Sequence, residues 1–346
     1  MYKKFSLYFL LSLVSICLIV LSINYIVDPY GKNDQFHGPF NTKKAVRDER
    51  ISKFKLIQEH PEAKSFLFGS SRGLLLDPIL FEKITHSPTL NLAFSSGSAD
   101  EHYLYIKYLL ETREVENIMI GIDLFAYAKG FTSHGTLPQE LRNHFNLDSN
   151  YPLTNYLSFS MLKKSFKTIK INLRDKAVDI NKYTAKGQIS SSGYKNVQNS
   201  PEQLKAYLLE NVINKPARWD TRFNELDTKR LAQLLEISEL CKDKGTKLYL
   251  FTSPLYIKQI RMKYNKFFLQ KELLSYIVKN ISPVWDYNAL TQINLDPYAF
   301  DDEFHYTFKT ADSMMSEVLT GKPTIRAYKG TYISKENVDA YLSQIN

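Results

Sequence analysis

Two short segments near opposite ends of the chain carry residue types that can form a serine hydrolase site. Residues 66–68 are a short apolar run that leads into Gly69-Ser70-Ser71-Arg72. A strand that ends in a Gly-led turn can hold a hydroxyl group above a sheet, with backbone N–H groups beside it. Near the other end, Asp302-Glu303-Phe304-His305 offers a base and a carboxylate to orient it. A serine hydroxyl is a weak nucleophile at neutral pH, so it needs an imidazole to accept its proton and a third group to fix the imidazole tautomer.

The elements around these segments follow an alternating β/α pattern. Five apolar runs have the length and flanks of buried parallel strands, at residues 65–68, 90–93, 118–122, 247–251 and 283–285. Ser98 and Glu101 match a capping box that opens a helix to about residue 111. A second helix ends at Gly245, and its apolar face carries Leu231, Leu234, Leu235 and Leu240. This pattern predicts an α/β fold, a three-layer α/β/α sandwich with a five-stranded parallel sheet. Sites in such sheets form at the carboxyl ends of strands, where Ser70 and Ser71 would lie.

The N-terminus predicts a membrane anchor. Lys3 and Lys4 precede an apolar run over residues 5–27, and about 20 such residues suffice to cross a bilayer as a helix. Positive charge ahead of the span predicts a single-pass protein of the cell membrane whose C-terminal domain is extracytoplasmic. A cleaved signal peptide is the alternative, but the apolar run is longer than a usual signal core and no small residues mark a cut site. We therefore expect an uncleaved anchor over 1–27 and a linker over 28–41.

Residues 42–346 are expected to form one α/β domain with an insertion at about 130–224. Residues 42–59 are expected to form its first helix. Within the insertion, Leu162, Phe166, Ile169 and Leu173 recur at helical spacing among several lysines, which predicts a basic amphipathic helix. Such a helix either packs on the domain as a cap, the commoner role and the one that we favour, or lies on an anionic membrane surface.

Composition narrows the classes of partner and cofactor. The formal net charge of +9 favours an anionic neighbourhood of lipid headgroups or wall polymers, and the sequence contains no nucleic-acid-binding motif. Outside the predicted anchor Cys241 is the only cysteine, so no intramolecular disulfide is expected. The seven histidines are scattered and no Cys/His cluster has ligand spacing. We therefore expect neither a metal nor another cofactor.

The two end segments resemble blocks of the SGNH or GDSL-type hydrolase superfamily, whose sheet is flavodoxin-like. Within it the chain is similar to the bacterial membrane-anchored branch that includes the D-alanyl-transfer protein of the teichoic acid system and alginate acetylation proteins. The third position of the first block is the nucleophile, which implies Ser71 rather than Ser70. In the last block the Asp orients the His, which implies that Asp302 orients His305. The resemblance covers most of the chain after the anchor and is weakest across the insertion.

The resemblance also implies an oxyanion hole, and there the chain departs from the family. Residues 91–97 resemble the second block, so the backbone N–H groups of Ser71 and Gly97 are the expected donors, with Ser96 in place of Gly97 if the alignment shifts by one. The third block is commonly Gly-x-Asn-Asp, whose Asn completes the hole, but the corresponding strand here ends in Asp123. An ionised carboxylate would oppose a developing oxyanion. Asp123 therefore points elsewhere, binds substrate or weakens hydrolysis, and Arg72 either recognises an anionic substrate group or forms a structural ion pair.

These features together predict an envelope-anchored serine esterase or O-acyltransferase. Its substrates would be ester-linked acyl groups of a cell-surface glycan or polymer, and a transferase would need a membrane-bound O-acyltransferase partner as the source of acyl groups. The alternative is a non-catalytic SGNH-like accessory protein that binds a surface polymer or a membrane acyltransferase. The missing Asn and the large insertion motivate this second hypothesis.

Overall fold

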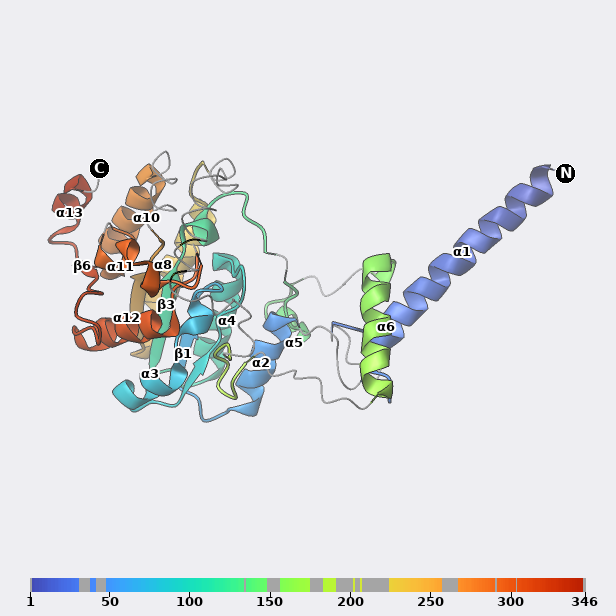
Figure 1. Ribbon diagram of the computed structural model, residues 1–346, viewed down its shortest axis with the longest axis horizontal. Coiled ribbons are helices and arrows are strands. Elements are labelled where there is room, and N and C mark those ends of the chain that lie inside the picture. The colour runs from blue at the N-terminus through green and yellow to red at the C-terminus, as the bar shows by residue number, and fades with distance from the viewer. Residues whose placement is uncertain are drawn as a thin grey trace. The chain divides into compact units, whose positions relative to one another are not determined.

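The chain divides into two compact units. A computed structural model describes residues 2–30, 38–41, 48–133, 135–147, 156–174, 183–190, 202, 206, 224–256, 267–289, 291–302 and 304–344. One unit comprises Met1–Lys55 and Gly135–Ile180, and the other comprises Leu56–His134 and Asn181–Asn346. Figure 1 draws both units and labels many of their elements. Most of the expected insertion after residue 190, and residues 42–47 of the expected first helix, lie outside the described residues.

The second unit is built on a six-stranded sheet in the order β2-β1-β3-β4-β5-β6. The strands are β1 (Ser65–Phe68), β2 (Thr89–Asn91), β3 (Asn117–Ile122), β4 (Lys247–Thr252), β5 (Val284–Asp286) and β6 (Thr331–Ile333). The first five are parallel, and β6 pairs antiparallel with β5. The prediction of a five-stranded parallel sheet is therefore wrong in its count and in its edge. β6 has only three residues and its middle side chain, Tyr332, faces solvent, so it lacks the apolar run that marks a buried strand.

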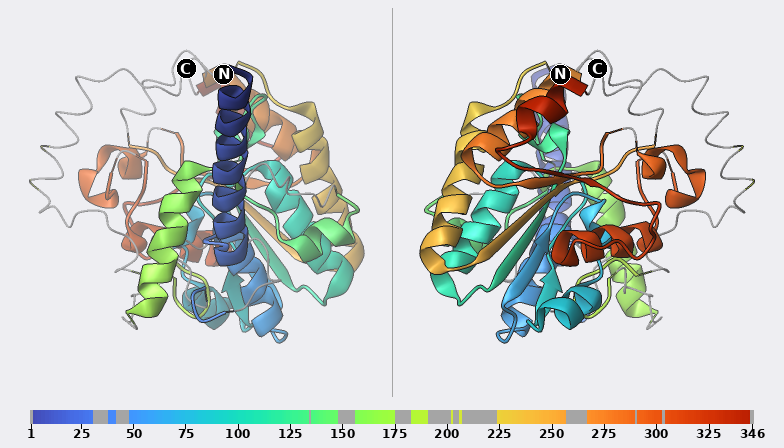
Figure 2. Two further views of the ribbon diagram at one scale, coloured as in Figure 1. Left: turned by 90° about the vertical axis from the view of Figure 1, so that its right-hand side faces the viewer. Right: turned by 90° about the vertical axis from the view of Figure 1, so that its left-hand side faces the viewer.

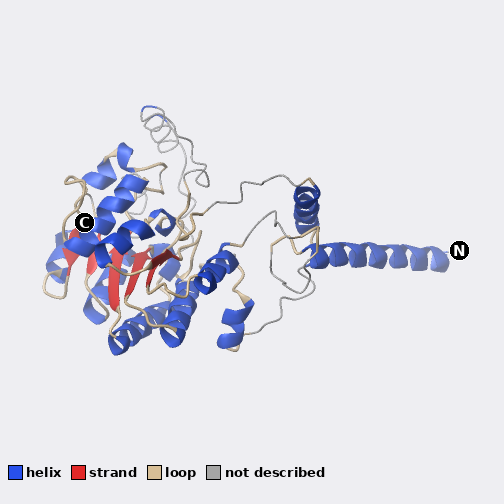
Figure 3. Cartoon of the chain, turned by 90° about the horizontal axis from the view of Figure 1, so that it is seen from below, coloured by secondary structure: helices blue, strands red, loops and turns tan. Residues whose placement is uncertain are grey.

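Helices cover both faces of this sheet. α3 (Pro78–Thr85) packs with α12 (Phe308–Thr320) on one face, and α4 (Ala99–Thr112) packs with α8 (Thr228–Lys244) on the other (Figure 2). α10 (Phe267–Asn280) contacts β5 and α13 (Val338–Gln344). The strands lie between helices in Figure 3, which confirms the α/β class. The short helices η1 (Gly73–Leu75), η2 (Leu124–Tyr127), α11 (Gln292–Leu295) and η5 (Pro297–Ala299) lie in the connections.

Local sequence signals explain where the main helices begin and end. α4 starts with the expected capping box, in which Ser98 and Glu101 satisfy each other's backbone N–H groups. α8 ends at Gly245, whose left-handed conformation (φ 70°) suits a residue without a Cβ. β1 and β3 are buried along their whole length because helices cover both sides of the sheet. Each large apolar side chain buried there contributes roughly 2 kcal/mol to the free energy of folding. β1 is therefore a stable strand, and the turn that follows it begins from a fixed position.

The first unit contains α1 (Tyr2–Val27), α5 (Gln139–His144) and α6 (Phe159–Leu173), and α2 (Glu49–Glu59) spans the boundary between the units. Within α1, Lys4–Val27 is long and apolar enough to cross a membrane, and most of its large apolar side chains are exposed. α6 packs against α1.

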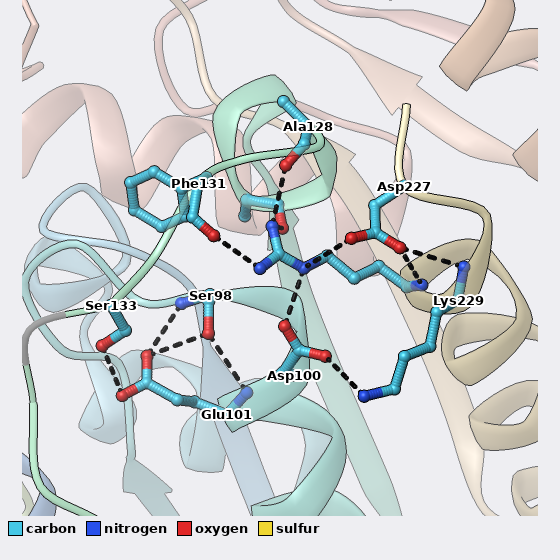
Figure 4. A network of polar contacts seen from close by, with 10 residues as sticks. Ser98, Asp100, Glu101, Ala128, Phe131, Ser133, Asp227 and Lys229 are labelled. Carbon is cyan, nitrogen blue, oxygen red and sulfur yellow. Dashed lines mark hydrogen bonds and ion pairs between the residues drawn. The ribbon is translucent and has the colours of Figure 1, made fainter. Parts of the chain in front are cut away.

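A buried arginine holds the segment that follows β3. The guanidinium of Arg230, on α8, donates hydrogen bonds to the carbonyl oxygens of Ala126, Ala128 and Phe131, at 3.2, 2.8 and 2.6 Å. Its Nε donates to Asp100 on α4 at 2.7 Å (Figure 4). One side chain thus fixes the backbone of residues 126–131 to both helices of that face.

We expect Arg230→Gln to destabilise the protein by about 3 kcal/mol, because several buried hydrogen bonds are lost and the carbonyl groups stay buried. The matched control is Lys229→Ala, at the neighbouring position. Lys229 is 76% exposed and lies 3.8 Å from the same Asp100, so its loss is expected to cost less than about 0.5 kcal/mol. Denaturant unfolding measures both, and equal effects would contradict the role of Arg230.

Candidate active site

The turn after β1 places Ser71 at the carboxyl end of an inner strand. Gly69 has a φ of 155°, and a Cβ on it would lie 3.2 Å from the Cα of Gly73, so the turn is too tight for a side chain there. Asn91 clamps the next residues, because its amide donates to the carbonyl oxygens of Gly73 and Leu76 at 2.8 and 2.9 Å. Ser71 is half-buried, whereas Ser70 is buried.

The structure brings Ser71, His305 and Asp302 together. The Oγ of Ser71 lies 2.8 Å from Nε2 of His305. The Nδ1 of His305 lies 2.9 and 2.8 Å from the two carboxylate oxygens of Asp302. Because an ionised carboxylate only accepts, Nδ1 carries the hydrogen and Nε2 is left as the acceptor for the Ser71 hydroxyl. The arrangement has the connectivity of a Ser-His-Asp triad, and the side chains of His305 and Asp302 remain 22% and 20% exposed.

Two neighbouring carboxyl groups in this loop have opposite pKa shifts. Burial alone would raise the pKa of Asp302, but the hydrogen bond with His305 and those from the backbone N–H groups of Phe304 and His305 outweigh it, so the pKa lies below its usual range. Burial raises the pKa of Asp301 to about 6, with a further contribution from the charge of Asp302. Asp302 is therefore the carboxylate that stays ionised beside the imidazole.

Tyr306 connects the loop that carries His305 to the turn that carries Ser71. It is fully buried, and its hydroxyl donates to the carbonyl oxygen of Arg72 at 2.8 Å. The loop closes on itself through the N–H of Asp301, which donates to the carbonyl oxygen of His305 at 2.8 Å. Tyr306 was not among the site residues expected from the sequence. Its position directly after His305 was the only available signal, because the partner is a backbone carbonyl far away in the sequence.

His102 contacts the backbone of the same turn from α4, and it too was not among the site residues expected from the sequence. It is buried on α4, and its Nε2 lies 3.2 Å from the carbonyl oxygen of Gly69. A carbonyl only accepts, so this nitrogen carries the hydrogen. The absence of a side chain on Gly97 makes room for the ring, since a Cβ there would lie 2.6 Å from Nε2.

The two expected oxyanion donors, the N–H groups of Ser71 and Gly97, differ in whether the N–H already donates a hydrogen bond. Within the described part of the chain, no acceptor is found for the N–H of Ser71. The N–H of Gly97 donates to the carbonyl oxygen of Phe94 at 3.1 Å, across a turn in which Ser96 has a φ of 51°. A substrate oxygen would have to displace Phe94 to use Gly97, whereas Ser71 needs no such change.

Arg72 and Asp123 pair with each other. Nη1 of Arg72 lies 2.8 Å from Oδ1 of Asp123, and the two side chains are only 8% and 1% exposed. Among the described residues neither carboxylate oxygen accepts a well-aligned hydrogen bond, so the contact is an ion pair without that alignment. The guanidinium also lies over the ring of Phe125, 5.8 Å from its centre. Of the roles left open by the sequence, this geometry matches the structural ion pair.

The described residues contain no group of three or more His, Cys, Asp or Glu side chains that could hold a metal ion. Comparison with known proteins adds no assignment: no family model matches the chain, and no curated protein matches it.

The opposite pKa shifts predict opposite effects for two neighbouring substitutions. A buried carboxyl with a raised pKa opposes folding once it ionises, so Asp301→Asn is expected to stabilise the protein by about 1 kcal/mol at pH 7, after allowance for partial exposure. The gain should shrink as the pH falls from about 6 and vanish near pH 4. Asp302→Asn should instead destabilise at pH 7, and its deficit should disappear only as the pH falls through the lowered pKa of Asp302. Unfolding free energies measured against pH test both, and shifts of the same sign would contradict the assignment.

The substitution Asp123→Asn tests the ion pair between Arg72 and Asp123. The substitution leaves the buried guanidinium of Arg72 without its counter-charge, so we expect a loss of about 3 kcal/mol. The double variant Arg72→Met, Asp123→Asn should recover most of this loss, because it removes both charges. Denaturant unfolding of the two single variants and the double variant gives the coupling. Full stability of Asp123→Asn would contradict a structural pair.

Proposed function

We propose that this protein is an envelope-anchored serine esterase or O-acyltransferase that acts on ester-linked acyl groups of a cell-surface glycan or polymer. The observation that carries the proposal is the continuous chain of contacts from Ser71 through His305 to Asp302. The type of substrate rests on the resemblance of the motifs to SGNH-type enzymes.

In this mechanism Ser71 attacks the acyl carbonyl while Nε2 of His305 takes its proton. Asp302 holds the imidazole in the required tautomer and stabilises the imidazolium ion that forms. The N–H of Ser71 donates a hydrogen bond to the oxyanion. The N–H of Gly97 becomes a second donor if the substrate displaces the carbonyl oxygen of Phe94. His305 then returns the proton to the leaving group. Transfer of the acyl group from Ser71 to water makes an esterase, and transfer to a sugar hydroxyl makes a transferase.

We further propose that α1 anchors the protein in the cell membrane and that the unit carrying the triad is extracytoplasmic. The length and apolar surface of α1 support the anchor, and Lys3 and Lys4 ahead of it support the orientation. In this location a membrane-bound O-acyltransferase is a suitable partner to supply acyl groups.

One observation favours a second candidate function, a non-catalytic accessory protein that binds a surface polymer or a membrane acyltransferase. The expected oxyanion hole has lost one donor to Phe94, and a carboxylate stands where the family has its Asn. Loss of a single oxyanion donor typically lowers the rate about 100- to 1000-fold. The accessory hypothesis predicts that Ser71→Ala preserves the cellular role of the protein.

Labelling with a fluorophosphonate probe separates the two candidates. We expect the full-length protein in membranes to be labelled at Ser71, because the probe reacts with a serine whose proton is taken by a histidine. Ser71→Ala should abolish labelling, and His305→Ala should slow it by roughly 1000-fold or more. Ser70→Ala is the matched control and should label normally. The adduct is mapped by mass spectrometry, and a folded protein without any label at Ser71 would favour the accessory role.

A further inference from the structure

α6 is fastened to the last turns of α1 by a buried polar contact. The amide of Asn24 is fully buried and donates to the carbonyl oxygens of Tyr156 and Ser158, at 2.6 and 3.0 Å. Its oxygen accepts a hydrogen bond from the hydroxyl of Ser165 at 2.8 Å. The ring of Tyr25 packs edge-on against that of Tyr156. Asn24 is the strongly polar residue of the apolar run, and α6 with the residues just before it satisfies its side chain.

A second face of α6 is apolar and exposed. Phe159, Phe166 and Leu173 are 68%, 55% and 66% exposed, and half-buried Leu162 and Ile169 lie between them in the same row. A row of large apolar side chains along a helix is normally buried against the rest of a protein. Here the residues that face inward are Met161, Ser165 and Thr168 instead.

The third face is basic. It carries Lys163, Lys164, Lys167, Lys170 and Arg174, and residues 156–174 contain no Asp or Glu. Successive residues of an α-helix are rotated by about 100°. Viewed down the helix axis, the apolar row therefore lies about a third of a turn from the buried row of Met161, Ser165 and Thr168. The basic residues follow the apolar row in the same sense of rotation. Figure 1 shows α6 crossing α1 near the C-terminal end of that helix.

We propose that α6 lies in the interface of an anionic lipid bilayer, at the point where α1 leaves the membrane. An interfacial helix has an apolar face in the acyl boundary and a basic face near the headgroups, and α6 has both. α1 also keeps an exposed apolar side chain close to its C-terminal end, Ile26 with 53% exposure, so both helices carry surface that is compatible with lipid. The proposal takes the membrane-surface role in place of the cap role that the sequence favoured. The inference rests on the proposed anchoring by α1.

This arrangement gives the protein two linked attachments to one membrane. A single span leaves the depth and tilt of a helix open to variation, and interfacial side chains restrict both. The lysines add attraction to anionic lipid. The hydrogen bonds of Asn24 join the two attachments, so the polar amide is satisfied at the level where the span ends.

Depth-dependent quenching in lipid vesicles tests the proposal with the full-length protein. An environment-sensitive fluorophore is attached through Phe166→Cys or Phe159→Cys in a Cys17→Ser background, in which the remaining Cys241 is buried. The matched controls are Lys163→Cys and Lys167→Cys on the basic face. In vesicles of phosphatidylcholine and phosphatidylglycerol, bromine on the lipid acyl chains should reduce emission at positions 159 and 166 by about half. Emission from the two control positions should change little.

A fluorophore on the native Cys17, in the middle of α1, distinguishes failure of the anchor from failure of the inference. Absence of quenching at Cys17 would overturn the anchor itself. Quenching at Cys17 without quenching at positions 159 and 166 would overturn the role of α6. A blue-shifted emission at position 166 that lipid bromine does not quench would assign the apolar row to a protein partner instead, and it would equally overturn the proposal.

Discussion

The candidate site depends on one contact, the 2.8 Å approach of Ser71 to His305 across 234 residues of sequence. Closing so long a loop is entropically unfavourable, so other interactions must hold both ends. β1 supplies one, because it is an inner strand paired on both sides and buried along its length. The loop that carries Asp302 and His305 supplies the other, and the buried hydroxyl of Tyr306 donates directly to the carbonyl oxygen of Arg72. The triad is thus fixed by groups that take no part in its chemistry.

Arg72, the residue next to Ser71, shows how electrostatics and stability are coupled at this site. Arg72 and Asp123 are nearly inaccessible to solvent, and burial of two charges is favourable only when each compensates the other. Asp123 also raises the pKa of the buried hydroxyls of Tyr127 and Tyr306, after the larger effect of burial. The guanidinium of Arg72 compensates the charge of the buried Asp123 carboxylate. An Asp is therefore tolerable here only together with an Arg, and the two residues act as one unit.

Much of the fold could be predicted from local sequence, because local signals determine it. The apolar runs located five strands to within one or two residues, and the capping box of Ser98 and Glu101 gave the start of α4. β6 was missed because three residues at a sheet edge carry no periodic signal. The site residues with sequence motifs, Ser71, Asp302 and His305, were named in advance. Tyr306, His102 and Arg230 were not, because each acts through backbone carbonyls of segments distant in sequence.

The division of the chain places the candidate site and the candidate membrane span in different units. All the residues of the candidate site lie in the unit of Leu56–His134 and Asn181–Asn346, whereas α1 and α6 lie in the other unit. The chain passes between the units three times, after Lys55, His134 and Ile180, so the first unit is more than an N-terminal tail. α6 belongs to the first unit although its sequence interrupts the second, and the buried amide of Asn24 contributes hydrogen bonds that join it to α1. The contacts that join Ser71, His305 and Asp302 involve only residues of the second unit.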